Sequence, residues 1–213
     1  MGKSTGLSAC LATLYISAVK QRKNQPDPHF FGYGSLVNRQ THAYGDTRPA
    51  SVCGWRRQWQ HTSLRKLAYL SVVKVDGGEI DGLIAAVPNG DWRALDLREG
   101  AYDRLALPDA VVRHDHPETI NVQIYHTRPG IVAPPTVRHP VLQSYLDTVV
   151  LGYLDVFGIE GAARFFQSTD GWDSPVLDDR RQPIYSRAIA LSPKQRLLVD
   201  GFLDDLSVTR FWP

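Results

Sequence analysis

Cysteine and net charge are both scarce in this chain. Its 213 residues include only Cys10 and Cys53, and 24 lysines and arginines stand against 22 aspartates and glutamates, a difference of +2. Two thiols are too few for a disulfide framework or a four-thiolate zinc site, which predicts a reducing compartment such as the cytoplasm. A charge so near neutrality gives little attraction to nucleic acid or an anionic membrane, so neither is expected as a partner.

The chain also lacks a hydrophobic run that could span a bilayer, which takes about 20 residues. The stretch most similar to a targeting signal, residues 7–19, is followed by a basic segment and not by the small residues of a cleavage site. Its leucines, Tyr15 and Ala18 share one side at helical spacing. Residues 1–25 are therefore predicted to form an amphipathic helix and linker packed on the domain, with a cleaved signal as the alternative.

Strand patterns dominate the first part of the chain, and helix patterns dominate the last. The predicted strands are 29–33, 50–60, 67–75, 79–87 and 118–127, with a hairpin turn at 76–78. The predicted helices are 92–99, 140–157, 162–168 and 192–206. Strands followed by helices are typical of an α+β fold, here one domain over residues 26–213. The apolar face of the helix after Pro140 is most simply core, and a partner-binding face is the alternative.

Two glycines flank Tyr33 in the segment 31–36, Phe-Gly-Tyr-Gly-Ser-Leu. Glycine lets the backbone approach a ligand closely, and successive N–H groups in such a turn form a concave site for an anion. A carboxylate or a developing oxyanion suits such a site. The alternative is a plain strand-to-turn transition, and the segment lacks the third glycine and the following lysine of a phosphate-binding loop.

Glu99 falls at the C-terminal end of the predicted helix 92–99, where Gly100 suits the left-handed position that ends a helix. The partial negative charge of that helix end disfavours a carboxylate and raises its proton affinity, which favours a role as a general acid or base. Arg98 and Arg104 would oppose this effect if they pointed at the carboxylate. The alternative is a surface helix with paired charges.

Three other groups could carry chemistry. The triplet 114–116, His-Asp-His, suggests a metal site, but it lies in one loop and no spacing links it to His126 or His139, so a solvated loop is expected. Cys53 could pair with a histidine as a nucleophile, but its strand pattern favours a buried, inert thiol. The run 55–59, Trp-Arg-Arg-Gln-Trp, could stack nucleobases, but packing of the aromatic rings with an arginine stem is simpler.

Three segments of the chain occur in a recognisable order. They are the glycine turn 31–36, the Gly-Trp-Arg-Arg strand 54–60 and the acidic segment 95–102, all within residues 29–127. Together they resemble the γ-glutamylcyclotransferase superfamily, including its ChaC-like and AIG2-like branches. The resemblance implies a mixed β-barrel with helices packed around it. It also implies an enzyme that releases 5-oxoproline from a small γ-glutamyl compound without a metal or an organic cofactor.

The resemblance also implies roles for individual residues. The family's catalytic glutamate falls on Glu99. Substrate contacts fall on six residues: Tyr33, Gly34, Ser35, Leu36, Tyr102 and Tyr145. Residues 61–67 depart from the pattern of ChaC-like enzymes that act on glutathione, which have His-Arg-Gly and a proline-rich stretch there. A glutathione-specific enzyme and a non-catalytic AIG2-like binding protein therefore stay as alternatives. The leaving amine and the oligomeric state stay open, and Trp172, Arg187 and Arg57 are candidates to contact that amine.

Overall fold

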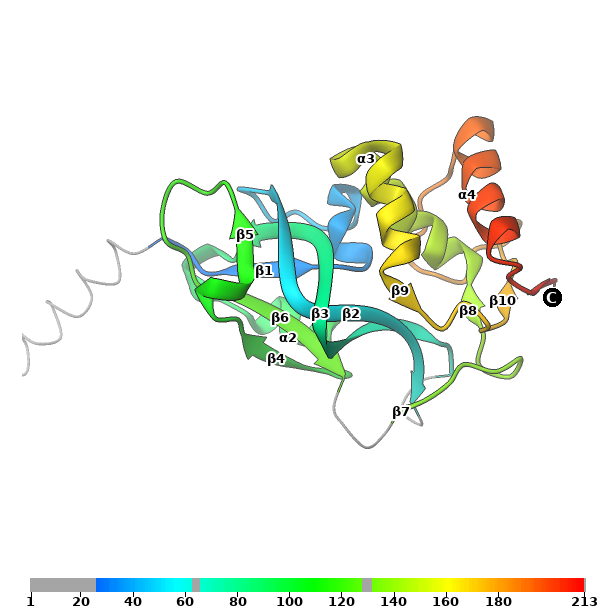
Figure 1. Cartoon of the computed structure of the whole chain (residues 1–213), viewed down its shortest axis with the longest axis horizontal. Helices are drawn as coiled ribbons and strands as arrows, with labels where there is room; N and C mark the ends of the chain where they lie inside the picture. Colours follow the sequence, from blue (N-terminus) through cyan, green and yellow to red (C-terminus); the bar gives the residue numbers. More distant parts are fainter. Residues whose placement is uncertain (1–25, 63–65, 128–131, 213) are drawn as a thin grey trace, which may run out of the picture.

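A mixed sheet forms the centre of the molecule, and a second, smaller sheet lies near the C terminus (Figure 1). The computed structural model describes residues 26–62, 66–127 and 132–212, so the predicted N-terminal helix at 1–25 lies outside the described residues. The strands are β1 (His29–Gly32), β2 (Arg48–Thr62), β3 (Tyr69–Ala86), β4 (Tyr102–Ala106), β5 (Val112–His114), β6 (Val122–Thr127), β7 (Val132–Ala133), β8 (Val141–Leu142), β9 (Thr169–Asp170), β10 (Val176–Leu177) and β11 (Arg210–Phe211). The helices are α2 (Arg93–Arg98), α3 (Gln143–Gln167) and α4 (Pro193–Asp205), with 3-10 turns η1 (Ser35–Val37), η2 (Arg39–Thr41), η3 (Pro88–Gly90) and η4 (Asp109–Val111).

The central sheet has the strand order β4-β6-β1-β3-β2-β5, and the short strands β7 and β9 also pair with β2. Strand β1 runs antiparallel to β3 and parallel to β6, which makes the sheet mixed. The predicted α+β class is therefore confirmed. The pairing path starts at β4 and ends at β5, and within the described residues it does not show the closed barrel that the resemblance implied.

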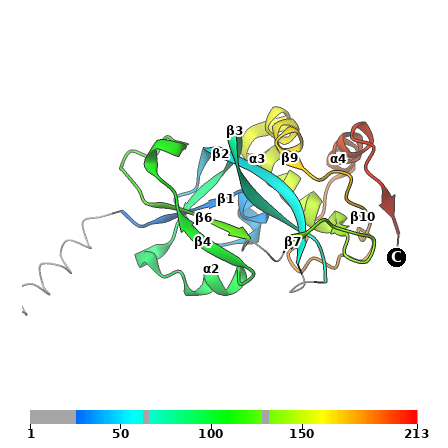
Figure 2. The same cartoon turned by 60° about the horizontal axis from the view of Figure 1, so that its bottom comes forward.

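Strand β1 is buried on both of its faces. Successive side chains of a strand point to opposite sides of the sheet. Phe31 accordingly packs in the larger core with residues of α3, and Phe30 packs in the smaller core with residues of α2 and its flanks. Figure 2 shows α2 on one side of the strands and α3 with α4 on the other. The C-terminal end of β1 therefore lies between α2 on one side of the sheet and α3 on the other.

Helix α3 fills the larger core with the apolar face that its sequence predicts. Leu146, Val149, Val150 and Tyr153 are all fully buried, so this face is core and not a free docking surface. The helix is interrupted at Gly158, whose φ of 68° separates the two helical segments expected from the sequence. Helix α4 begins at the predicted Ser192-Pro193 start, with a capping box between the side chains and backbones of Ser192 and Gln195.

Helix α3 also approaches the 3-10 turns that follow β1. A Cβ atom on Gly152 would lie 2.7 Å from the backbone nitrogen of Asn38, so only glycine fits at this crossing. The Asn38 side-chain amide donates a hydrogen bond to the Thr148 carbonyl at 2.8 Å. These contacts fix the segment after β1 against a rigid helix.

One predicted hairpin is wrong. Residues 67–75 and 79–87 do not pair with each other, because both belong to the single long strand β3, which pairs along its length with β2. The pairing shifts from Cys53–Glu79 to Trp55–Lys74, so the Asp-Gly-Gly segment at 76–78 lies in a bulge and not in a turn. Gly100, expected in a left-handed conformation, is not among the described glycines with positive φ.

The described helices were compared with the requirements of a membrane-spanning segment. Within the described parts of the chain, no helix has both the length and the apolar content that a bilayer requires.

Candidate active site

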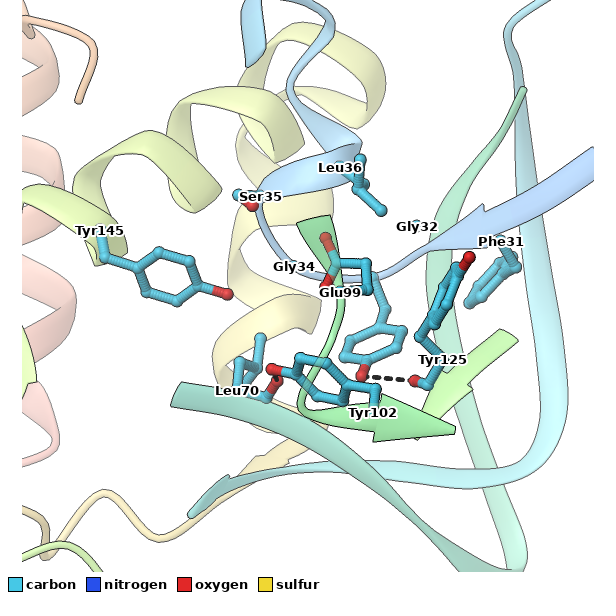
Figure 3. Close-up of a pocket in the computed structure, with 11 residues that line it drawn as sticks. Phe31, Gly32, Gly34, Ser35, Leu36, Leu70, Glu99, Tyr102, Tyr125 and Tyr145 are labelled. Carbon is cyan, nitrogen blue, oxygen red and sulfur yellow. Dashed lines mark hydrogen bonds between the residues drawn. The ribbon is translucent and has the colours of Figure 1, made fainter. Parts of the chain in front are cut away.

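The turn after β1 forms one wall of a pocket (Figure 3). The chain leaves β1 at Gly32 and enters the 3-10 turn η1, in which the Val37 N–H donates to the Gly34 carbonyl at 3.0 Å. The first N–H groups of such a turn have no partner inside it, so they face outward, and that of Ser35 meets the Tyr145 phenol oxygen.

Glu99 forms the opposite wall from the end of α2. Its backbone N–H donates to the Leu95 carbonyl at 2.9 Å, and its own carbonyl accepts from the Tyr102 N–H at 2.8 Å. The helix thus stops at Glu99 and turns directly into β4. The side chain is only 16% exposed, and Figure 3 shows its carboxylate beside Gly34. The acidic group and the glycine turn therefore share one pocket, as the sequence predicts.

Arg98 ties the acidic wall to the turn. Its Nε lies 3.2 Å from Oε1 of Glu99, and this guanidinium also donates to Oγ of Ser35 at 3.2 Å. A further hydrogen bond runs to the Thr41 carbonyl at 2.9 Å. The arginine thus places a positive charge beside the Glu99 carboxylate. The helix end favours a higher proton affinity at Glu99, and the positive charge of Arg98 opposes it. The raised proton affinity that the sequence suggests therefore stays a prediction.

Four tyrosines complete the walls and floor. The Tyr33 hydroxyl donates to the Tyr125 carbonyl at 2.7 Å. The Tyr102 hydroxyl donates to the Leu70 carbonyl at 2.9 Å, and Figure 3 shows these two residues side by side. Burial raises the pKa of Tyr33, Tyr125 and Tyr145 above that of a free phenol, and the negative charge of Glu99 adds to each shift. These three phenols therefore stay neutral at physiological pH and can act as hydrogen-bond donors.

Several solved structures resemble this arrangement of strands and helices. One is a γ-glutamyl cyclotransferase, at 13% identity and a TM-score of 0.51, with 82% of this chain and 98% of that chain covered. An uncharacterized protein from Homo sapiens matches at 13% identity and a TM-score of 0.52, covering 81% of this chain and 97% of that one. No protein-family model and no curated protein sequence matches the chain.

A third structure is YkqA from Bacillus subtilis, at 17% identity and a TM-score of 0.53. The match covers 69% of this chain but only 55% of YkqA, so the chain spans about half the length of that protein. The chain has the γ-glutamyl cyclotransferase fold. At these identities the likeness establishes the fold and leaves the reaction to be argued from the pocket.

Every residue that the sequence assigned to the site lines this one pocket of the γ-glutamyl cyclotransferase fold. The assigned residues are Glu99, Tyr33, Gly34, Ser35, Leu36, Tyr102 and Tyr145. They come from the end of β1, the end of α2, the start of β4 and helix α3. Their convergence is a structural fact, while their catalytic and substrate-binding roles stay predictions.

Sequence reasoning missed Leu70 and Tyr125, which also line the pocket. Tyr125 follows Ile124 in β6, so the alternation of that strand points it away from the larger core and toward α2. Its hydroxyl donates to Oδ1 of Asp96 on α2 at 2.5 Å. The alternation alone could have indicated this side of the sheet, but it could not have paired β6 with β1.

Arg57, Trp172 and Arg187 do not line the pocket, contrary to their candidacy for the leaving-amine side. Arg57 is fully buried beneath the turn, where its Nε donates to the Tyr33 carbonyl at 3.2 Å. Its neighbours Trp55 and Trp59 are buried on the same strand face, which confirms the packing interpretation of that run. Arg57 thus supports the turn from below and does not contact a ligand in the pocket.

Two further expectations need correction. Cys53 is a half-buried free thiol beside the β2 bulge, not a fully buried one, and it does not line the pocket. The loop at 114–116 is not simply solvated, because the His116 side chain is 4% exposed and contacts Asp46.

Gly34→Ala tests how tightly the pocket is built. A Cβ atom at this position would lie 2.8 Å from the Tyr145 hydroxyl oxygen, so the substitution should lower the free energy of unfolding by about 1–3 kcal/mol. Urea denaturation measures the loss. Because the clash involves the hydroxyl, adding Tyr145→Phe should recover part of it. A double variant no more stable than Gly34→Ala would show that this contact is not the cause.

Proposed function

We propose that the protein is a γ-glutamylcyclotransferase, which cleaves a γ-glutamyl amide by intramolecular aminolysis and releases 5-oxoproline. The observation that carries the proposal is the Glu99 carboxylate, mostly shielded from solvent and placed beside the Gly34 turn in one pocket. The likeness in fold to a γ-glutamyl cyclotransferase supports the same reading.

The reaction needs no second reactant. A γ-glutamyl compound carries its own nucleophile, the α-amine, and its own electrophile, the γ-carbonyl carbon. The amine nitrogen bonds to that carbon and closes a five-membered ring, and the bond from the carbon to the leaving nitrogen breaks. Holding the two groups together can lower the barrier by about 7–11 kcal/mol. The pocket therefore has to fix a folded conformation of the substrate.

Glu99 moves the protons in this proposal. An α-amino group titrates near about 8, so it is mostly protonated at neutral pH and cannot attack. The attacking nitrogen loses two protons as it changes from ammonium to the ring amide. Glu99 takes the first before the attack and gives it to the leaving nitrogen. It then takes the second from the ring nitrogen and passes it to the released amine, which departs as an ammonium ion, so no net proton remains on the enzyme. Acid–base catalysis of this kind contributes about 10²–10⁴-fold.

The turn and the tyrosines orient the substrate. N–H groups of Gly34, Ser35 and Leu36 would donate to the substrate carboxylate or to the oxyanion that develops on the γ-carbonyl. Tyr102 and Tyr145 border the same space and would limit how the glutamyl group can lie. The arrangement favours a small γ-glutamyl compound as the partner. The cytoplasm stays the predicted location, on the cysteine content alone.

An assay of the wild-type protein tests the proposal. A panel of γ-glutamyl amino acids, γ-glutamyl amines and glutathione is incubated with catalytic amounts of the protein, and 5-oxoproline and the released amine are measured by mass spectrometry. Equal amounts of the two products, many per protein molecule, are expected from at least one class. Release from glutathione alone would identify the glutathione-specific alternative. Calorimetric binding without any turnover would contradict catalysis and support the binding-protein alternative.

A further inference from the structure

Two histidines and an aspartate converge away from the pocket. His29 is the first residue of β1, Asp46 lies in the loop before β2, and His116 lies in the loop after β5. Their ligand atoms all lie within 4.8 Å of one another. The glycine turn leaves β1 at its other end, so this cluster and the pocket are separated by the length of the strand.

The spacing of the three side chains suits a small metal ion. Nε2 of His116 lies 3.1 Å from Oδ2 of Asp46, and Nε2 of His29 lies 3.7 Å from the same oxygen. Ligands at about 2.0–2.2 Å around a tetrahedral zinc ion lie about 3.3–3.5 Å from one another. The two measured distances bracket that range, so small side-chain movements would complete the coordination.

The Nδ1 atom of each imidazole ring lies at hydrogen-bond distance from a backbone carbonyl, as is usual for metal-binding histidines. Nδ1 of His29 lies 2.9 Å from the Asp27 carbonyl, and Nδ1 of His116 lies 3.0 Å from the Glu118 carbonyl. When each Nδ1–H donates to its carbonyl, the lone pair of each Nε2 points into the cluster. The other oxygen of Asp46 is engaged by Nε of Arg48 at 3.3 Å, which leaves Oδ2 for the cluster.

His29 is the observation that points to a ligand. The residue is 1% exposed, and its Nε2 atom has no hydrogen-bond partner among the described residues. Oδ2 of Asp46, at 3.7 Å, is too far for a hydrogen bond. A buried nitrogen without a partner, aimed at a carboxylate and a second imidazole, is explained by an ion between them.

A hydrogen bond between His116 and Asp46 is the metal-free alternative. In that arrangement Nε2–H of His116 donates to Asp46, and its Nδ1 accepts from the Glu118 N–H at 3.1 Å. This state satisfies His116 and leaves Nε2 of His29 unpaired. A shared ion satisfies both rings and the carboxylate.

We propose that His29, Asp46 and His116 bind one divalent first-row transition ion, with Zn²⁺ as the best fit. Two imidazoles and a carboxylate form a donor set that zinc accepts, with water in the fourth position. Magnesium and calcium prefer all-oxygen sites and are not expected to bind. The ion joins the start of β1 to two loops, so its effect is on stability, and the glutamyl chemistry proceeds without it.

Isothermal titration of the metal-free protein with Zn²⁺ tests this site. Wild type should bind one ion per chain, and its melting temperature should rise as the zinc concentration exceeds the dissociation constant. Asp46→Asn keeps the size of the side chain and tolerates the left-handed backbone at this position, where φ is 43°. This variant and His116→Ala should each weaken binding by at least about 10–100-fold, the range that loss of even an outer partner produces.

The matched control is His139→Ala. His139 stacks on His61 with ring centroids 3.7 Å apart, and zinc could also collect at this histidine pair. The control should bind zinc as wild type does, and Mg²⁺ should give no heat in any variant. Wild type without one-to-one binding would overturn the proposal, and so would unchanged affinity in both Asp46→Asn and His116→Ala. None of these measurements depends on 5-oxoproline release.

Discussion

Glu99→Gln should reduce the rate of 5-oxoproline release by about 10²–10⁴-fold, the share that a positioned acid–base group contributes. The amide cannot take a proton from the substrate ammonium group. It keeps the shape of the side chain, so a γ-glutamyl ligand should still enter the pocket. A coupled assay for 5-oxoproline gives the rate, and calorimetry with the best substrate gives the affinity. Rate loss with binding retained is the expected pair of results.

Two controls separate this effect from damage to the fold. Glu160→Gln removes a carboxylate from an exposed position on α3, outside the pocket, and should leave both rate and affinity unchanged. The melting temperature of Glu99→Gln should stay near that of wild type, because the amide oxygen can still accept a hydrogen bond from Arg98 and no buried volume is lost. Arg98 also keeps its hydrogen bonds to Thr41 and Ser35. A Glu99→Gln variant that retains wild-type turnover would exclude Glu99 as the acid–base group.

The site was predictable from sequence because its parts carry local signals. The glycines of the turn, the charged end of a short helix and the Gly-Trp-Arg-Arg strand can each be recognised in isolation. Their convergence could not be derived from spacing alone, since it depends on the parallel pairing of β1 with β6 and on α3 crossing the turn at Gly152. The family resemblance supplied that long-range information.

The errors have a common physical cause. A bulge and a hairpin turn both use Asp and Gly, so the segment 76–78 has the composition of a turn while lying inside β3. Which of the two forms depends on the partner strand, and β2 is long enough to pair on both sides of the bulge. The histidine cluster was missed for a similar reason, since His29, Asp46 and His116 are far apart in sequence and meet only in the folded sheet.

Arg57 shows how a charged residue can be structural. Besides the Tyr33 carbonyl, its guanidinium contacts the Asp81 carbonyl and the Tyr153 hydroxyl, and its Nη1 donates to Oγ of Ser168 at 2.6 Å. The Tyr153 ring lies 4.9 Å from the guanidinium carbon. Strand alternation placed this arginine on the same face as two buried tryptophans. Only the folded structure shows that it donates hydrogen bonds to the Tyr33 and Asp81 carbonyls.

Arg57→Met should therefore lower the free energy of unfolding by about 3–5 kcal/mol. The variant keeps an apolar stem but leaves the Tyr33 and Asp81 carbonyls to share the single hydroxyl hydrogen of Tyr153, which lies 2.9 Å from each. Hydrogen bonds from a charged donor contribute about 1.5–3 kcal/mol each, and a buried acceptor left without a partner costs about 1–3 kcal/mol. Urea denaturation followed by tryptophan fluorescence measures the loss.

Arg56→Met is the matched control, since it makes the same change one residue earlier on the opposite face of β2. Arg56 forms a partly exposed ion pair with Asp170, with Nη2 2.6 Å from Oδ1, and such pairs contribute about 0–1 kcal/mol. Its loss should be several-fold smaller than that of Arg57→Met. Equal losses would mean that the hydrogen bonds to the Tyr33 and Asp81 carbonyls do not stabilise the fold. A large difference would show that the turn carrying Gly34 rests on a buried guanidinium, so that the geometry of the pocket is set from beneath as well as from its walls.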